Sequence, residues 1–69
     1  MGVKHRAVKA HELRRGDVIV HAKTGERYRF AAPLFTSGRI MIREVKAPNA
    51  HPLFIRCESD QDVLIEVTA

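Results

Sequence analysis

The stretch Glu26-Arg27-Tyr28-Arg29-Phe30 decides the class of fold, because charged and aromatic side chains alternate strictly from Arg27 to Phe30. Successive side chains of a β-strand point to opposite faces, so the two aromatic residues would lie on one face and the two arginines on the other. The segment 39–45 alternates in the same way. These segments therefore predict neighbouring strands in a sheet with one apolar face and one basic face.

Other short alternating or β-branched segments lie on both sides of this pair, at 17–22, 53–58 and 63–68. Residues 1–9 are expected to form either a first strand or a flexible N-terminus, and the only helical candidate, 10–15, is one turn at most. Short strands at this spacing are typical of an antiparallel meander, and closing the sheet into a barrel would hide its apolar face. We therefore predict an all-β fold, a small antiparallel SH3-like barrel of five to six strands that occupies residues 1–69 as a single domain.

The turn between the two central strands determines which face each arginine occupies. A three-residue turn at 36–38, with its glycine left-handed, would place Leu34 opposite Ile40. A bulge at Pro33 would reach the same parity by another route. Either way, the outer face is expected to carry Arg27, Arg29, Arg39, Arg43 and Arg56, with Met41 and Phe54 between them. The predicted core is Leu13, Val18, Val20, Tyr28, Phe30, Ile40, Ile42, Leu53, Ile55, Val63, Ile65 and Val67.

The charge is distributed unevenly over the 69 residues. All twelve Lys and Arg and four of the eight acidic residues lie in 1–56, whereas the other four acids lie in 57–69, so these parts carry +8 and −4. A basic surface attracts polyanions and gains affinity from counterion release. If the first strand pairs with the last, the acidic end would lie against basic residues and neutralise part of that charge.

Several classes of protein are not expected from this sequence. The longest apolar run, 30–35, is far shorter than the roughly 20 residues that span a bilayer, and no apolar signal-peptide region follows Met1. The single cysteine, Cys57, cannot form an internal disulfide, and its alternation with apolar neighbours predicts a small buried side chain. The histidines and Cys57 lack the close spacing of zinc ligands. We therefore expect a cytoplasmic protein that is not an enzyme and has no metal, no cofactor, no membrane contact and no small-molecule substrate.

Three segments together form a pattern: 13–20, with the sequence Leu-Arg-Arg-Gly-Asp-Val-Ile-Val, the hairpin 25–30 and the closing 62–67. The pattern resembles the KOW type of SH3-like barrel, similar to the N-terminal domain of elongation factor P, in which Leu-x-x-Gly-Asp opens a strand and Gly-x-x-Tyr-x-Val follows. Phe30 stands where that family usually has Val. The resemblance implies ribosomal RNA, other nucleic acid or RNA polymerase as partners. The loop 35–39 lacks the modified lysine of the elongation factor, which argues against the same activity in translation.

Two functional hypotheses follow. In the first, the five outer arginines hold the phosphates of nucleic acid or of a nucleoprotein complex, and Phe54 stacks on a base. In the second, the chain is a protein-interaction module or a phage or host regulatory protein that self-associates through an apolar patch or through an edge strand near 31–35 or 63–69. That patch would draw on Ala31, Phe35, Met41, Phe54 and Leu64. A third interpretation is a solvated face on which Arg29 or Arg56 pairs with Glu44 or Glu58.

Overall fold

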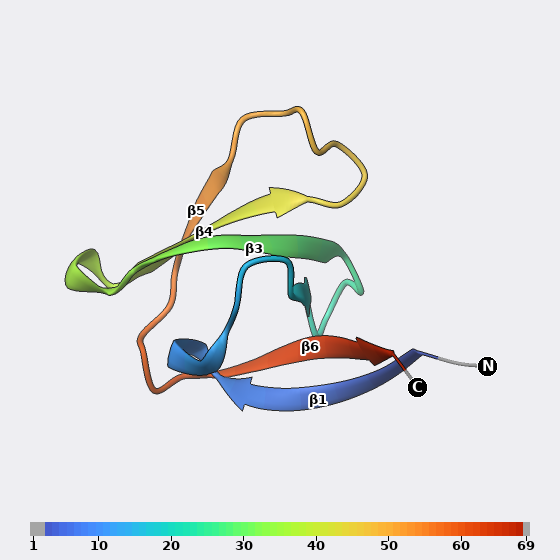
Figure 1. Ribbon diagram of the computed structural model, residues 1–69, viewed down its shortest axis with the longest axis horizontal. Coiled ribbons are helices and arrows are strands. Elements are labelled where there is room, and N and C mark those ends of the chain that lie inside the picture. Colours follow the sequence, from blue (N-terminus) through green and yellow to red (C-terminus); the bar gives the residue numbers. More distant parts are fainter. Residues whose placement is uncertain (1–2, 69) are drawn as a thin grey trace.

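Six antiparallel strands form one sheet that curls into a half-barrel, as described for residues 3–68 by a computed structural model (Figure 1). The strands lie in the order β1-β6-β2-β3-β4-β5. The all-β prediction of five to six short strands is confirmed, and the candidate first strand is β1; residues 1–2 lie outside the described residues. The elements are β1 (Val3–Lys9), the 3-10 helix η1 (Ala10–Glu12), β2 (Val18–Val20), β3 (Arg27–Leu34), the 3-10 helix η2 (Phe35–Ser37), β4 (Arg39–Glu44), β5 (Leu53–Arg56) and β6 (Asp62–Thr68).

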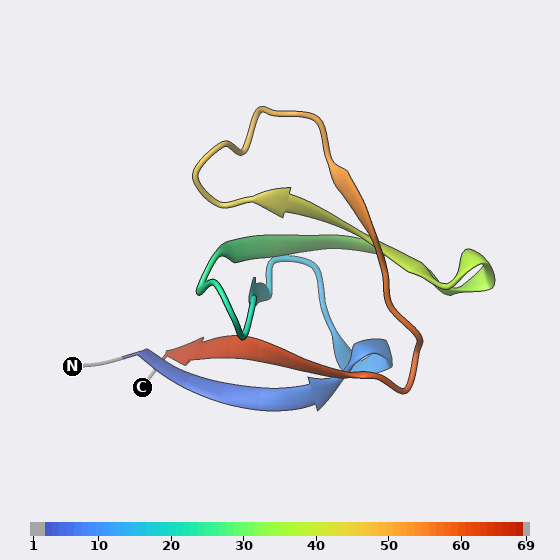
Figure 2. The same ribbon diagram turned by 180° about the vertical axis from the view of Figure 1, so that it is seen from behind.

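The first strand pairs with the last along its whole length, from Val3 opposite Thr68 to Lys9 opposite Asp62. This pairing brings the acidic end of the chain against basic residues, as expected: Lys9 Nζ lies 2.8 Å from Asp62 Oδ1. Figures 1 and 2 show β1 and β6 on one side of the curled sheet and β3, β4 and β5 on the other. Within residues 3–68, β1 and β5 occupy the two ends of the strand order, so the sheet keeps two edges.

The edges therefore differ from those predicted. The expected edge at 63–69 is wrong, because β6 lies between β1 and β2; Ala69 is outside the described residues. The expected edge near 31–35 is open only on the side of β2, which pairs with residues 27–29 of β3 and no further. On its other side, β3 is paired with β4 as far as Leu34. Pro33 lies in the part of β3 that extends beyond β2, where a missing N–H costs no hydrogen bond to a strand on that side.

The register between β3 and β4 is set by a helical turn and a bulge. Gly38, left-handed with φ 68°, closes η2, and Leu34 lies opposite Arg39 rather than opposite Ile40. The register then shifts between Phe30 and Ala32, so the bulge lies at Ala31 and not at Pro33. The predicted three-residue turn is therefore wrong. A single extra residue reverses the face of every following side chain. The bulge therefore still places Phe30 on the face of Ile42 and Arg29 on the face of Arg43, as the prediction required.

The inner face of the half-barrel holds the core. Four of the predicted core residues are not buried as expected: Val18 and Val20 face away from it, and Leu53 and Ile55 are 41% and 40% exposed. Ile19 is buried in place of its neighbours because it lies opposite both Tyr28 and Ile65. Cys57 is 2% exposed, which confirms the prediction of a small buried side chain. The buried residues are Val8, Ala10, Leu13, Ile19, Phe30, Ile40, Ile42, Cys57 and Ile65, with Tyr28, Phe35, Val63 and Val67 packed against them.

Ile40 and Ile55 provide a direct test of where the core ends, since they lie opposite each other on one face but are 1% and 40% exposed. We expect Ile40→Val to lower the free energy of unfolding by about 1 kcal/mol, because it removes a methyl group from a packed site. Ile55→Val should cost less than about 0.5 kcal/mol, because the methyl group removed there is partly hydrated. Urea denaturation of both variants measures this difference, and equal effects would contradict an open inner face at β5.

Candidate nucleic-acid interface

The outer face of β3, β4 and β5 brings the five predicted arginines together. Arg29 lies opposite Arg43, and at the other end of β4 Arg39 lies opposite Arg56. Buried Ile40 and Ile42 alternate with these residues, which places the arginines on the solvent side of the sheet. We call Arg27, Arg29, Arg39, Arg43 and Arg56 the arginine face.

Phe54 lies on the same face, between the two ends of the arginine face. It sits opposite Met41 in the β4–β5 register, and 53% of its surface is exposed. Phe35, by contrast, is half-buried and packs against the core. Phe54 is therefore the aromatic side chain of this face that is open to contact from outside.

Arg27 is the member whose charge is neutralised. Its Nε lies 2.7 Å from Glu66 Oε2, and its Nη2 donates to Glu66 Oε1 at 3.0 Å. Two parallel contacts between a guanidinium and a carboxylate fix both groups in orientation as well as in charge. Arg27 therefore forms the margin of the arginine face, tied to β6.

The other four arginines keep their charge. Arg29 Nη1 donates to the Gly16 carbonyl at 3.1 Å, and Arg43 Nη1 donates to the Ala50 carbonyl at 3.0 Å. These acceptors orient the guanidinium groups but carry no formal charge. Within residues 3–68 the ion pairs are Lys9–Asp62 and Arg27–Glu66, so the expected pairing of Arg29 or Arg56 with Glu44 or Glu58 does not form.

Two like-charge pairs therefore lie directly across neighbouring strands. Like charges in such positions destabilise a sheet by roughly 0.2–1 kcal/mol per pair, less at high salt. An anion placed between the members of a pair would remove this repulsion. The outer face therefore carries positive charge that no carboxylate within residues 3–68 neutralises at these two pairs.

A turn at residues 14–17 adds an arginine that the sequence did not point to. Asp17 Oδ2 accepts from the Arg14 amide at 2.9 Å, so its carboxylate holds the turn. The Gly16 amide donates to the Phe30 carbonyl at 3.1 Å and fastens the turn to β3. Arg15 is thereby carried to the arginine face; only the register of the turn against β3, which the sequence does not encode locally, could have revealed this.

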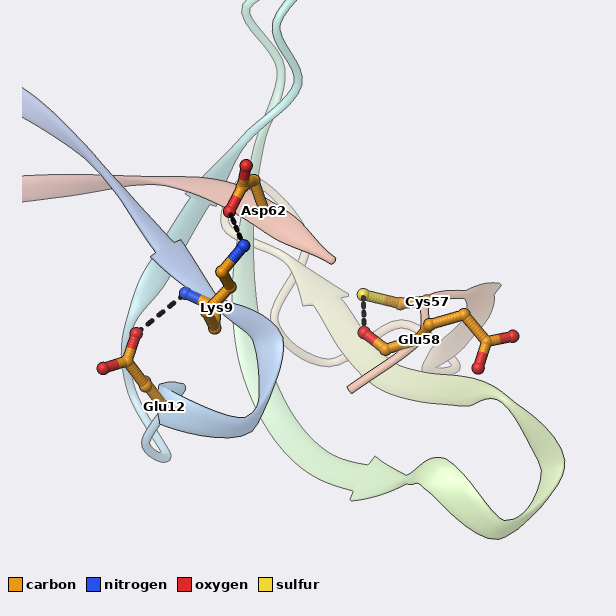
Figure 3. Close-up of polar contacts among 5 residues, drawn as sticks. All are labelled: Lys9, Glu12, Cys57, Glu58 and Asp62. Atoms are coloured by element: carbon orange, nitrogen blue, oxygen red, sulfur yellow. Dashed lines mark hydrogen bonds and ion pairs between the residues drawn. The ribbon is translucent and has the colours of Figure 1, made fainter. Parts of the chain in front are cut away.

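Figure 3 shows the polar contacts near Cys57 and the β1–β6 pair. The Cys57 thiol donates to the Glu58 carbonyl at 3.8 Å, and Glu12 Oε1 accepts from the Lys9 amide at 2.9 Å beside the Lys9–Asp62 ion pair. Burial, and secondarily the Glu58 carboxylate, raises the pKa of Cys57 above its ordinary value. A thiol of this kind is a poor nucleophile at neutral pH.

The described residues offer neither a cluster of metal ligands nor a membrane-spanning helix. In this part of the chain, no group of three or more His, Cys, Asp or Glu side chains is placed to hold a metal ion. None of the helices among residues 3–68 has the length and apolar character required to cross a bilayer.

Comparison with protein-family models, with curated proteins and with solved structures finds no match for this chain. The resemblance to KOW-type barrels is therefore carried by the residues quoted for it, and it stays a prediction.

The two kinds of arginine on this face should respond differently to substitution. We expect Arg27→Gln to lower the free energy of unfolding by about 0.5–1 kcal/mol, because it removes the double contact with Glu66. Arg39→Gln should leave stability unchanged or raise it slightly, since it relieves repulsion from Arg56. Urea denaturation at about 50 mM salt, where screening is weak, measures both variants. An equal decrease in the two would show that Arg39 has a structural partner.

The buried thiol predicts a pH dependence of stability. The pKa of Cys57 is raised in the folded state, so the protonated thiol contributes to the free energy of unfolding. This contribution is fully present below the unfolded-state pKa of about 8.5 and is lost as the pH rises through the folded-state pKa. Tyr28 and Lys9, whose pKa values are raised by their bonds to Glu26 and Asp62, extend the decline to higher pH. Urea denaturation under reducing conditions should show a shallower slope above pH 8.5 for Cys57→Ala. Identical slopes would contradict the assignment.

Proposed function

We propose that this chain is a non-enzymatic binding module that contacts nucleic acid, alone or within a nucleoprotein complex, through the arginine face. The observation that carries the proposal is the gathering of five arginines on one side of β3, β4 and β5, four of which have no carboxylate partner within residues 3–68. Guanidinium groups match phosphate geometry with two parallel donors, which suits them to this role.

The spacing of the face supports contact with a single strand. Arg39 and Arg43 are four residues apart on β4, about 14 Å at the rise of an antiparallel strand. Phe54 lies between these two positions on the neighbouring strand, with a ring open to solvent. A strand could therefore place phosphates at both ends of β4 and stack one base on Phe54. The resemblance to KOW-type barrels, whose partners include RNA, points the same way.

The test is fluorescence anisotropy with labelled single-stranded RNA and DNA of mixed sequence over a salt series. We expect the double variant Arg39→Gln, Arg56→Gln to bind more weakly and to reduce the slope of log K against log salt by about 1.4, because each of two phosphates that is no longer neutralised accounts for about 0.7. The matched control is Lys4→Gln, Arg6→Gln on β1, which removes the same charge at the opposite edge of the sheet.

The control variant should keep a slope close to that of the wild type. Phe54→Ala should weaken binding by about 1–3 kcal/mol with little change in the salt slope, because stacking releases no counterions. Absence of binding by the wild type at about 50 mM salt would overturn the proposal.

The edge strand β5 favours self-association as a second candidate function. Leu53, Phe54 and Ile55 are all at least 40% exposed, on both faces of a strand that pairs only with β4 in the described chain. The Cys57 amide donates to the Gly38 carbonyl at 2.8 Å. By the alternation of an antiparallel ladder, the backbone groups of Phe54 and Arg56 then point away from β4.

A second copy of the chain fits this edge. Antiparallel pairing of two β5 strands about a two-fold axis through Ile55 would place Phe54 opposite the partner's Arg56 on the outer face, a favourable cation–π arrangement. The two Ile55 side chains would meet on the inner face and cover each other. Both features follow from the order Phe-Ile-Arg in this strand.

Sedimentation equilibrium over a concentration series tests this pairing. We expect a reversible dimer whose dissociation constant rises at least about tenfold in Ile55→Lys, because two charges would then meet at the axis. Val3→Lys, at the exposed opposite edge, is the matched control and should leave the dimer intact. A wild-type chain that sediments as a monomer at every concentration would exclude the pairing.

A further inference from the structure

A pocket of about 330 Å³ opens on the outer face where the 14–17 turn meets β3, close to the Ala31 bulge. In Figure 2 the segment between η1 and β2 runs up against β3 at this place. Three arginines from three separate segments line it: Arg15 from the turn, Arg29 from β3 and Arg43 from β4. Met41 and the backbone around the bulge complete the wall.

The charged side chains that line this pocket are all basic. No acidic residue lines it, whereas the pocket at the other end of β3, of about 320 Å³, includes both Glu26 and Glu44. Arg29 and Arg43 each donate through one Nη1 to a carbonyl, at Gly16 and Ala50. A guanidinium has five N–H donors, so each side chain is held in place and still has donors for a ligand.

The bulge makes this pocket. Because the register shifts at Ala31, Arg29 and Arg43 lie directly opposite each other, and the sheet bends beside them. A regular ladder with the Leu34–Arg39 register would have set Arg29 opposite Glu44, on the same face as buried Ile40 and Ile42, and would have turned Phe30 outward. The bulge instead buries Phe30 and leaves Arg29 opposite Arg43 on the outer face.

We infer that this pocket binds a phosphate monoester, carried either by the end of a nucleic-acid strand or by a free mononucleotide. Three arginines line one pocket, and a monoester brings close to two negative charges at neutral pH, whereas an internal phosphodiester brings one. The volume accommodates a phosphate together with the sugar that bears it, and Met41 offers an apolar wall. For the strand end, the inference rests on the proposed function, because the pocket lies on the arginine face.

The experiment compares one single-stranded oligonucleotide in three forms: with a 5′-phosphate, with a 3′-phosphate and with hydroxyls at both ends. At about 150 mM salt, we expect one of the phosphorylated forms to bind about tenfold more tightly than the hydroxyl form, the gain of one additional charge-assisted contact. Arg15→Gln should abolish this difference. Arg14→Gln, one residue away in the same turn and outside the pocket lining, is the matched control and should preserve it.

The double variant Arg39→Gln, Arg56→Gln separates the two proposals, because it should weaken all three oligonucleotides by the same factor. Equal affinity for the three forms in the wild type would overturn the terminal-phosphate pocket and leave the proposed function standing. Equal effects of Arg15→Gln and Arg14→Gln would likewise overturn the terminal-phosphate pocket and leave the proposed function standing.

The free nucleotide is tested by titrating adenosine monophosphate and, separately, adenosine into ¹⁵N-labelled protein. Saturable shifts of the Gly16 and Ala31 amides with the monophosphate alone, combined with no oligonucleotide binding, would assign the pocket to mononucleotides and overturn the proposed function. If neither the monophosphate nor a phosphorylated oligonucleotide shifts these amides, the inference is wrong. Circular dichroism of each variant is the control that checks whether the variant is folded.

Discussion

Phe30 lies directly opposite Ile42, and both side chains are buried on the inner face of the sheet. This contact holds β3 against β4 at the point where the Ala31 bulge changes the register. Because side chains alternate between faces, fixing these two residues inward fixes Arg29 and Arg43 outward and opposite each other. The arginine face, the pocket beside the bulge and the position of β5 therefore all depend on one apolar pair.

Strand periodicity was sufficient to predict the class of fold, and together with the requirement that Arg43 not share the core face of Phe30 it predicted the membership of the arginine face. Alternation in 26–30 and 39–45 requires only that one face be apolar, and burial then decides which face that is. The division of charge along the chain likewise predicted that the acidic end would lie against basic residues if the first strand paired with the last, and β1 does pair with β6. These properties depend on residue order within a strand, which the sequence states directly.

Register and edges were less accessible, because they depend on contacts between segments far apart in the chain. In the run 18–20 every residue is β-branched, so alternation gives no parity, and only the contact of Ile19 with Tyr28 and Ile65 decides which residue is buried. Leu53 and Ile55 alternate as core residues do, yet they stay exposed because β5 ends the sheet in the described chain. Arg15 reaches the arginine face through a hydrogen bond from its neighbour Gly16 to β3, which no local pattern encodes.

A chain of 69 residues has little stability to spare, since domains of this size retain only a few kcal/mol after the entropy of folding. The structure nevertheless opposes two pairs of arginines, and it leaves three large apolar side chains of β5 partly in water. Replacing one arginine of each pair by a neutral residue would remove the repulsion without disturbing the core. Features that oppose stability in this way are typical of binding surfaces, where a ligand supplies the missing charge or the missing cover. The Arg39–Arg56 pair and the exposed apolar side chains both lie at β5. Phe54 and Arg56 serve both proposed contacts, so a polyanion on the outer face and a second copy at the edge would compete for these two side chains.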